Sequence, residues 1–428
     1  MNRARLSYRQ IALGTLVGLA LSSACVDQGV IDGMKFNREP SSSQKTSPEA
    51  EMAGPAEPIA TNAACLDKAA EDILGEFSLG LARAFLEQTP EANAVLSPLG
   101  ASLSLGLVYP GAAGATAESI QNVLGMTGLC PTAVLESFQG VLARLPAAAK
   151  GVELELANGI FIQEGLAIAP AFIEQNQRYN RTEVRTVDFT APQTEADLDR
   201  WAAQATQGRI QKLAADSFSG DTLLLLLQAI SFKGTWAVAF DPQKTQPGTF
   251  YVSEDSTVPM TLMRTRGTFP MTSNDSLQAV TLPYGDGRLA MTVLLPHVSS
   301  LTAAYAALTL EGLRTLRAAM QEEETTVMLP RFAVSTETSL KSVLATLGLG
   351  GLFDARADLS GIVPEGGLSL HDMKQKTVLE VQETGTAAAS VTATEIKYGF
   401  FLASHPFLFV IHDRDTSDIL FAGKITRP

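Results

Sequence analysis

The chain has 428 residues, of which 46% are hydrophobic and 18% are charged, with 34 glycines and 21 prolines. This composition excludes a disordered chain, a coiled coil and a collagen-like repeat, and the length fits one large domain or two medium ones. The formal net charge of −13 disfavours binding to nucleic acids or anionic lipid surfaces, because like charges repel. Three cysteines are too few for a disulfide scaffold or a cysteine-based zinc module.

Residues 1–24 have the layout of a secretory signal peptide. Three arginines and no acidic residue precede an apolar run over residues 11–20, and small residues follow that run up to Ala24. The run is too short for a permanent transmembrane helix. Cys25 resembles the lipid-modified cysteine of bacterial lipoproteins, although Ser22 stands where that pattern prefers leucine. We expect a secreted or cell-envelope protein, either an outer-membrane lipoprotein anchored at Cys25 or a released protein in which Cys25 is an ordinary residue.

Residues 25–62 contain four prolines and a run of three serines, with almost no apolar periodicity. Such a segment cannot bury enough apolar surface to offset its chain entropy, so it predicts a flexible tether. No Pro/Gly-rich linker and no internal repeat divides the remaining chain. We therefore expect one globular domain over residues 63–428.

The predicted elements of this domain are helical near its start and mostly strands toward its end. Apolar residues at helical spacing predict a helix over residues 73–85 and a shorter helical stretch from Trp201 to Ile210. The nearly continuous apolar run from Leu223 to Phe232 predicts a strand that is covered on both faces. Further strands are predicted over residues 289–295, 327–329, 378–381, 407–412 and 419–425. This order favours an α+β fold.

Motifs of enzyme chemistry are missing from the sequence. None of the four histidines has the spacing of a zinc pair, and no nucleophile elbow, Walker loop or dinucleotide-binding fingerprint occurs. Residues 322–324 form a run of three glutamates between predicted elements, which is typical of a solvated face, and His405 is expected to be structural. We therefore expect neither a metal nor a cofactor. A secreted hydrolase with a triad dispersed along the chain stays open as an alternative.

The segment from Glu383 to Thr394 follows an apolar strand and contains only small residues after its glutamate. If this segment is a strand, alternate residues point to opposite faces. Over residues 386–398 the face of the even-numbered residues carries no charge, whereas Glu395 and Lys397 both fall on the other face. Such a segment can enter a sheet as a strand without burying an unpaired charge. The alternative is a flexible loop or an alanine-rich helix start.

The sequence over residues 65–428 resembles the serpin family through a series of ordered motifs. They lie at Asn93 with residues 96–98, and at residues 111–116, 156–158, 201–210, 232–236, 347–353, 358–361, 405–407 and 421–424. The segment described above resembles the family's hinge, with the residues Glu383, Gly385, Thr386, Ala387, Ala388, Ala389, Ser390, Val391 and Thr392.

The resemblance implies a fold of about nine helices around three sheets, with a large central mixed sheet and an exposed reactive-centre loop. It also implies a monomeric, single-use inhibitor rather than an enzyme, whose partner is a target serine or cysteine protease held in a covalent complex. In this mechanism the protease cleaves the loop, and the loop then inserts into the main sheet while the protease is still acylated. The alternative is a non-inhibitory serpin that acts as a binding or carrier protein or is cleaved as a plain substrate.

The position of the cleaved bond follows from the resemblance in two ways that disagree. Counted forward from Glu383, the bond follows Gly399, whereas counted back from Pro406 it lies near Glu395. We expect the bond among four residues, with Tyr398 favoured. These reactive-centre candidates are Lys397, Tyr398, Gly399 and Phe400.

The family pattern also includes positions beneath the main sheet, which opens when the loop inserts. The candidates there are Ser97, Gln228, Trp236, Arg331 and Gln375. Gly100, Gln228 and Gln375 replace the usual serine, asparagine and histidine, and the two glutamines are able to form a substitute hydrogen-bonded lock. Arg331 is expected to pair with Glu383.

Two cysteines remain in the globular domain, Cys65 and Cys130. In an oxidising compartment they are able to form a disulfide, and the alternative is two separate buried thiols.

Overall fold

The computed structural model of this chain describes residues 66, 74–90, 92–145, 150–384 and 399–428. The chain divides after Glu57 into two units, and every described residue belongs to the second, Pro58–Pro428. The expected signal peptide, Cys25, the tether over residues 25–62 and the hinge from residue 385 onward lie outside the described residues.

The described residues form an α+β structure, as the order of the predicted elements indicated. The α-helices are α1 (Leu74–Glu87), α2 (Pro98–Val108), α3 (Gly114–Val123), α4 (Pro131–Arg144), α5 (Pro170–Gln175), α6 (Thr194–Ala205), α7 (Thr302–Ala307), α8 (Leu310–Ala319) and α9 (Lys341–Leu344). The strands are β1 (Ala94–Leu96), β2 (Val152–Gln163), β3 (Val184–Val187), β4 (Leu224–Gly234), β5 (Gln246–Ser253), β6 (Ser256–Ser273), β7 (Leu277–Pro283), β8 (Leu289–Pro296), β9 (Gln321–Pro330), β10 (Phe332–Ser339), β11 (Asp372–Val381), β12 (Gly399–Leu402), β13 (Phe407–Asp413) and β14 (Ile419–Ile425).

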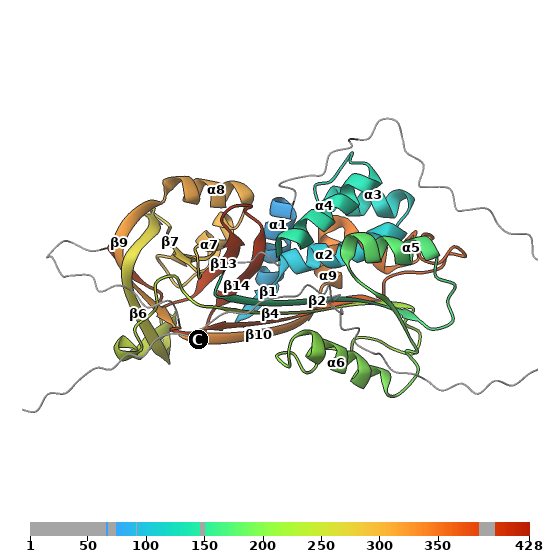
Figure 1. Cartoon of the computed structure of the whole chain (residues 1–428). Helices are drawn as coiled ribbons and strands as arrows, with labels where there is room; N and C mark the ends of the chain where they lie inside the picture. The colour runs from blue at the N-terminus through green and yellow to red at the C-terminus, as the bar shows by residue number, and fades with distance from the viewer. Residues whose placement is uncertain (1–65, 67–73, 91, 146–149, 385–398) are drawn as a thin grey trace, which may run out of the picture. The chain divides into compact units, whose positions relative to one another are not determined.

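The central sheet has five strands in the order β10-β11-β4-β2-β3. The pairs β10·β11 and β4·β2 are antiparallel, whereas β11·β4 and β2·β3 are parallel, so this is the mixed sheet that was expected. Helix α2 lies over one face of the sheet and α6 over the other (Figure 1). Both faces of the central strand β4 are therefore covered, which explains why this strand is almost continuously apolar.

Strand β4 divides its side chains between two cores. Alternate residues of a strand point to opposite faces. The main core contains Leu224, Leu226, Ile230 and Phe232, whereas Leu225, Leu227 and Ala229 pack in a second core with Leu198 and Ala202 of α6. Gln228 has the parity of the main-core residues, so its amide faces α2.

Helix α2 runs through the main core. Ser97 caps its first turn by accepting a hydrogen bond from the backbone N–H of Gly100 at 3.1 Å, and Pro98 occupies the first helical position. All eleven residues of the helix are buried, as expected for a helix that is apolar on every side. The helix therefore provides a fixed surface beneath β4.

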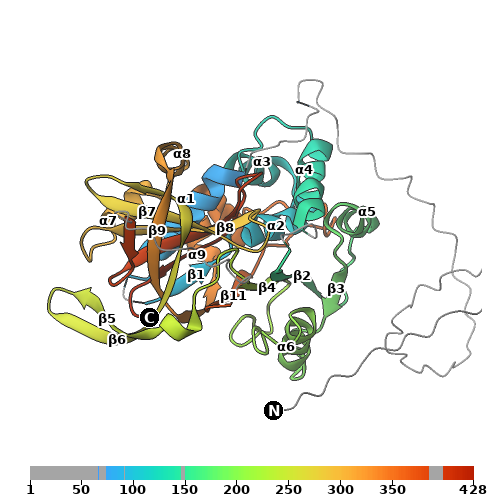
Figure 2. The same cartoon turned by 60° about the vertical axis from the view of Figure 1, so that its left-hand side comes forward.

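A second sheet has nine strands, and the 18-residue strand β6 connects its parts. Strand β6 pairs with β5, β7 and β9, so two of the three expected sheets are joined by hydrogen bonds through this one long strand. Strand β12 lies at the end of this sheet beside β9, and Figure 2 shows the hairpin of β5 and β6 that belongs to the same sheet.

Two local predictions were wrong. Helix α6 ends at Ala205 instead of continuing to Ile210, because Gln207 and Gly208 adopt positive φ angles that no α-helix contains. The three glutamates at residues 322–324 lie within β9 rather than between elements, and Glu324 pairs with Arg266 at 2.9 Å. None of the helices in the described parts of the chain is both long enough and apolar enough to cross a membrane.

Candidate functional site

The parallel contact between β4 and β11 forms a seam through the middle of the central sheet. The two strands pair continuously from Leu225 opposite Asp372 to Lys233 opposite Glu380. Strand β11 ends at Val381, and the hinge glutamate Glu383 follows two residues later. The seam and the start of the hinge therefore lie on one continuous stretch of chain.

A group of buried polar side chains, the seam cluster, lies at the midpoint of this contact. Gln228 and Gln375 are register partners, and each is 1% exposed. The side-chain amide of Gln375 donates to the Gln228 side-chain oxygen and to the backbone oxygen of Ser97, at 2.9 Å for the latter. The Ser97 N–H in turn donates to Gln375 Oε1 at 2.8 Å. The structure thus brings Ser97, Gln228 and Gln375 together in one hydrogen-bonded set.

The seam cluster extends from β11 across β4 to β2 and α2. Gln228 Nε2 donates to Asn158 Oδ1 on β2 and to Ser104 Oγ on α2, the latter at 3.2 Å. Ser104 and Asn158 were missed as members of the cluster. Asn158 falls within a family motif, but its register opposite Gln228 could be known only from the sheet.

Gly100 explains how Gln228 fits into the core. A Cβ atom at residue 100 would lie 2.3 Å from Gln228 Oε1, well inside contact distance. The longer glutamine therefore occupies the space that a side chain at position 100 would fill. The departures from the family pattern at residues 100 and 228 compensate for each other in volume.

A second group, the anchor cluster, holds the chain just before the hinge. The guanidinium of Arg331 donates two hydrogen bonds to the Glu383 carboxylate, one of them from Nε at 3.1 Å. Thr245 donates to the same carboxylate at 2.8 Å. Burial alone would raise the pKa of Glu383, but the hydrogen bonds from Arg331 and Thr245 outweigh burial and lower it below the ordinary value. Glu383 is therefore ionised at neutral pH.

Trp236 fixes the backbone on both sides of Glu383. Its indole N–H donates to the backbone oxygen of Gln382 at 2.7 Å, and its backbone N–H donates to the oxygen of Thr384 at 3.0 Å. The indole stacks on Tyr284 with ring centroids 4.2 Å apart. Tyr284 is buried, burial raises the pKa of its hydroxyl, and that hydroxyl has no hydrogen-bond partner among the described residues.

The four reactive-centre candidates divide between described and undescribed parts of the chain. Gly399 and Phe400 begin β12, where they pair in parallel with Thr325 and Thr326 of β9. Phe400 is 52% exposed. Lys397 and Tyr398 lie outside the described residues, as do the hinge residues from Gly385 to Thr392. Strand β12 was not predicted, because four residues give too little periodicity to indicate a strand.

Cys130 is disulfide-bonded. Its predicted partner Cys65 lies outside the described residues, but the next residue, Leu66, is described. The Leu66 N–H donates to the oxygen of Gly128 at 2.7 Å, and the Cys130 N–H donates to the oxygen of Leu66 at 2.9 Å. The backbone beside Cys65 is therefore in contact with Cys130.

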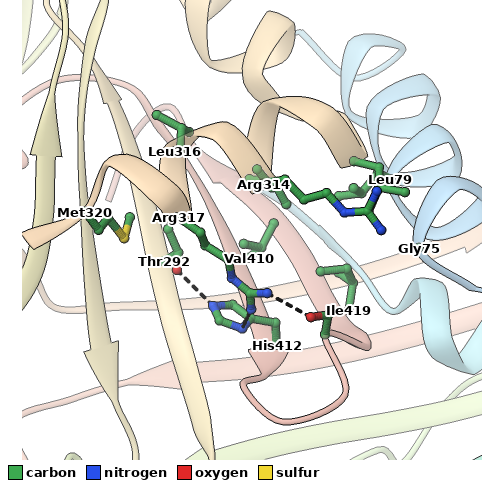
Figure 3. A pocket seen from close by; sticks show the side chains of 13 residues that line it. Gly75, Leu79, Thr292, Arg314, Leu316, Arg317, Met320, Val410, His412 and Ile419 are labelled. Atoms are coloured by element: carbon green, nitrogen blue, oxygen red, sulfur yellow. Dashed lines mark hydrogen bonds between the residues drawn. The ribbon is translucent and has the colours of Figure 1, made fainter. Parts of the chain in front are cut away.

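The histidine that most resembles a catalytic base is His412. Its Nε2 lies 2.9 Å from the Thr292 hydroxyl, as in a pair of nucleophile and base, and Figure 3 shows Arg317 directed at the same ring. Burial, with the Arg317 cation beside it, lowers the pKa of His412 to about 3. A base needs a carboxylate or carbonyl on its second nitrogen, whereas the Arg317 guanidinium lies 2.7 Å from Nδ1. This arrangement does not support a hydrolase, and the described residues contain no group of metal ligands.

Comparison with known proteins identifies the family. Residues 72–428 match the model of the serpin (serine protease inhibitor) family. The chain is 33% identical over 365 residues to Iripin-2 of Ixodes ricinus, covering 82% of this chain and 91% of the relative. It is 30% identical over 370 residues to the leukocyte elastase inhibitor of Bos taurus, covering 82% and 97%. The chain belongs to the serpin family.

Solved structures agree with this assignment. The structure of a tumour suppressing serpin has a TM-score of 0.75 and 27% identity, covering 83% of this chain and 98% of the other. The serpin fold that the motifs indicated is thereby confirmed. Its family is one of protease inhibitors rather than catalytic enzymes.

Proposed function

We propose that this serpin inhibits serine endopeptidases as a single-use covalent trap, and that cysteine endopeptidases are further targets. The nucleophilic oxygen or sulfur of the protease attacks a bait carbonyl between Glu383 and β12. The peptide bond breaks, the new amine leaves with a proton, and the upstream part of the chain stays esterified to the enzyme. Insertion of the freed segment into the central sheet then displaces the protease before water completes the reaction.

The parallel seam is the observation that carries this proposal. A segment that turns back after β11 runs antiparallel to it, and it also runs antiparallel to β4 because β4 and β11 are parallel. Insertion between them replaces one parallel contact by two antiparallel ones, which are slightly more stable per residue. The uncharged face over residues 386–398 allows this without burying a charge.

The seam cluster and the anchor cluster also support the proposal. Their contacts stabilise the closed form, in which β4 and β11 are paired and no loop is inserted between them. Opening the seam separates Gln228 from Gln375 and exposes both amides. Movement of the hinge separates Glu383 from Arg331 and from the Trp236 backbone. The inhibitor stays closed until cleavage frees a strand that replaces these hydrogen bonds.

The position of β12 favours a bait bond N-terminal to Gly399. A protease binds its substrate in an extended form that leaves the backbone free, whereas Gly399 and Phe400 are paired with β9. Of the four candidates this leaves Lys397 and Tyr398. Cleavage after Lys397 fits a trypsin-like protease, and cleavage after Tyr398 fits a chymotrypsin-like one.

A serpin that is cleaved without inserting its loop is the second candidate function. The observation that favours it is the completeness of the seam cluster, because every polar side-chain atom of Gln228 and Gln375 has a partner. Such a seam resists opening. The protein would then act as a binding protein or as a plain protease substrate.

The features outside the described residues complete the proposal. We propose export by the signal peptide over residues 1–24, with an outer-membrane lipid anchor at Cys25 and a monomeric inhibitor domain. We also propose that Cys65 is the disulfide partner of Cys130. Thiol titration of the denatured domain checks this pairing, since two free thiols without reductant would exclude it.

The test mixes the protein with trypsin and with chymotrypsin and separates the products on denaturing gels. A covalent complex should survive boiling and run at the sum of the inhibitor and protease masses, minus the mass of the released C-terminal fragment. The first residue of that fragment identifies the bait bond. Thr386→Arg places a charge on the uncharged face and should convert the inhibitor into a substrate. Ala387→Arg, on the other face, is the matched control and should still trap. Equal loss in both variants, or cleavage without a complex in the wild type, would favour the second candidate.

A further inference from the structure

Strand β12 is the first described element after the bait segment, the stretch of chain between Thr384 and Gly399. Its four residues pair in register with residues 325–328 of β9, and its other edge pairs with no described strand. The cleft of a protease holds several residues on each side of the bond that it cleaves. A protease bound at a bond just before Gly399 must therefore also contact β12.

Gly399 presents no side chain to this protease. A Cβ atom at residue 399 would lie 2.7 Å from the hydroxyl oxygen of Thr325, its buried register partner. Any larger residue would have to displace Thr325, so glycine fits the close approach of β12 to β9 at this point. Recognition on this side of the bond therefore depends on the residues after Gly399.

Phe400 is the residue that β12 presents to solvent. Its side chain is 52% exposed, whereas Phe401 is fully buried and belongs to the main core. Alternate residues of a strand point to opposite faces, which explains the difference between the two phenylalanines. The first side chain after the bond that a protease is able to reach is therefore an aromatic ring.

The position of Phe400 is fixed before a protease arrives. Its backbone pairs with Thr326 of β9, and Thr326 pairs on its other side with Arg266 of β6. A residue that is already held in place loses less conformational freedom on binding. Arg266 donates two hydrogen bonds to Glu324 Oε1, at 2.9 and 3.2 Å, so its charge is compensated within the sheet. The surroundings of the ring therefore favour an apolar partner.

The alternation of an extended chain relates Phe400 to the bait bond. A protease binds its substrate in an extended form, so side chains two residues apart point to the same side. If the bond follows Tyr398, then Tyr398 and Phe400 both point to the protease. If the bond follows Lys397, that lysine shares its side with Gly399, and Phe400 points away. An exposed ring contributes to recognition only in the first case.

We propose that Phe400 determines specificity, and that the target is a chymotrypsin-like protease with an apolar subsite two residues beyond the bond it cleaves. This protease takes Tyr398 in its primary pocket, cleaves between Tyr398 and Gly399, and buries the ring of Phe400 in that subsite. The inference rests on the proposed function, because it assumes that the bait segment is the part of the chain that a protease attacks.

Phe400 acts on the docking of the protease and not on its trapping. When the bond breaks, the enzyme stays esterified to the upstream part of the chain, whereas Phe400 stays in β12, paired with β9. Insertion and hydrolysis compete only after this separation. Phe400 should therefore change the rate of complex formation but not the number of inhibitor molecules consumed per protease trapped.

The test measures the binding of the whole protein to anhydrochymotrypsin, in which dehydroalanine replaces the catalytic serine. This probe docks but does not cleave, so the result is independent of trapping. Phe400→Ala should weaken binding about tenfold, as expected when about half of an aromatic side chain is no longer buried. Phe400→Leu stays apolar and should weaken binding by less than about threefold. Val298→Ala, at an exposed apolar position just after β8, is the control and should bind as the wild type does.

Three outcomes of this titration would overturn the proposal. Equal affinities of the wild type and Phe400→Ala would show that the ring is not bound. An equal loss for alanine and leucine would contradict an apolar subsite. The absence of wild-type binding to anhydrochymotrypsin would exclude the proposed class of protease.

Active chymotrypsin separates this inference from the proposed function. Phe400→Ala should form the covalent complex about tenfold more slowly, with unchanged stoichiometry, because only docking is affected. The released fragment should begin at Gly399, and a fragment that begins at Tyr398 would overturn the assignment of the bond. If no complex forms at all, the proposed function fails, and the binding of anhydrochymotrypsin still decides the role of Phe400. If wild type and Phe400→Ala form the complex equally fast, only this inference fails.

Discussion

The seam cluster and the anchor cluster both connect β11 or its continuation to the rest of the fold, but they do so with different chemistry. The seam cluster consists of neutral amides and a backbone segment, and its glutamines are almost fully buried. The anchor cluster depends on an ion pair in which Arg331 is 48% exposed. The stabilising contribution of the seam cluster should therefore not depend on pH or salt. The contribution of the anchor cluster should depend on both.

The largest effect should follow from Gln375→Leu, which removes the centre of the seam cluster. The substitution leaves the N–H of Ser97, the hydroxyl of Thr377 and the side-chain oxygen of Gln228 buried without partners among the described residues. Each buried unsatisfied group costs about 1–3 kcal/mol, so we expect a loss of about 3 kcal/mol or more in denaturant unfolding. Gln382→Leu, at an exposed position just beyond the end of β11, is the control and should change the stability by less than about 0.5 kcal/mol.

A smaller loss should follow from Gly100→Ser. The new Cβ collides with Gln228, and overpacking of a core typically costs about 1–3 kcal/mol. The double variant with Gln228→Asn should recover part of the loss, because the shorter amide leaves room for the serine. Gly220→Ala, where a Cβ meets no atom closer than 3.7 Å, is the matched control. Additive losses in the double variant would show that residues 100 and 228 do not compensate for each other.

At the end of the seam, Arg331→Ala should lower the free energy of unfolding by about 1 kcal/mol at neutral pH and low salt. The effect is small because solvent screens a partly exposed ion pair. The pKa of Glu383 is lowered in the folded state, so the contribution of the pair is present above the ordinary glutamate pKa. It should disappear as the pH falls through the lowered folded-state pKa. Unfolding of wild type and variant at pH 7 and pH 3, with and without 1 M salt, measures this difference.

The same variant tests whether the anchor cluster restrains the hinge. We expect Arg331→Ala to polymerise or insert its loop faster on heating than the wild type does. Unchanged oligomer state and heating behaviour would limit the pair to a role in stability. Lys244→Ala, which removes an exposed cation nearby, controls for the change in net charge.

The smallest effect should come from Tyr284→Phe beneath Trp236. The tyrosine hydroxyl is buried and has no partner in the described parts of the chain, so its removal breaks no hydrogen bond seen there and avoids the cost of burying it. We expect the variant to be neutral or more stable by up to about 1 kcal/mol, as measured by denaturant unfolding. A clear loss of stability would show that the hydroxyl makes a stabilising contact in solution.

The central fold was accessible from the sequence because its signals are local. The apolar run of β4 predicted a doubly covered strand, and the main core and the second core confirm it. The pairing of Gln228 with Gln375 was anticipated as a possibility, but Asn158 and Ser104 were not, because their proximity depends on sheet register and helix packing. The end of α6 was misplaced because the positive φ at Gln207 is not encoded by its residue type, and the stop signal of Gly208 was overlooked.

Strands β12, β13 and β14 determine what becomes of the chain after it is cut. Every residue of β13 and β14 is buried in the nine-stranded sheet, where they pair with each other and β13 also pairs with β8. A cut before Gly399 severs the chain but leaves the downstream piece embedded in this sheet. Cleaved protein should therefore elute from a sizing column as a single particle of unchanged size. Only a denaturant would release the short peptide, so loss of the intact chain would pass unnoticed in an assay that measures only the size of the native particle.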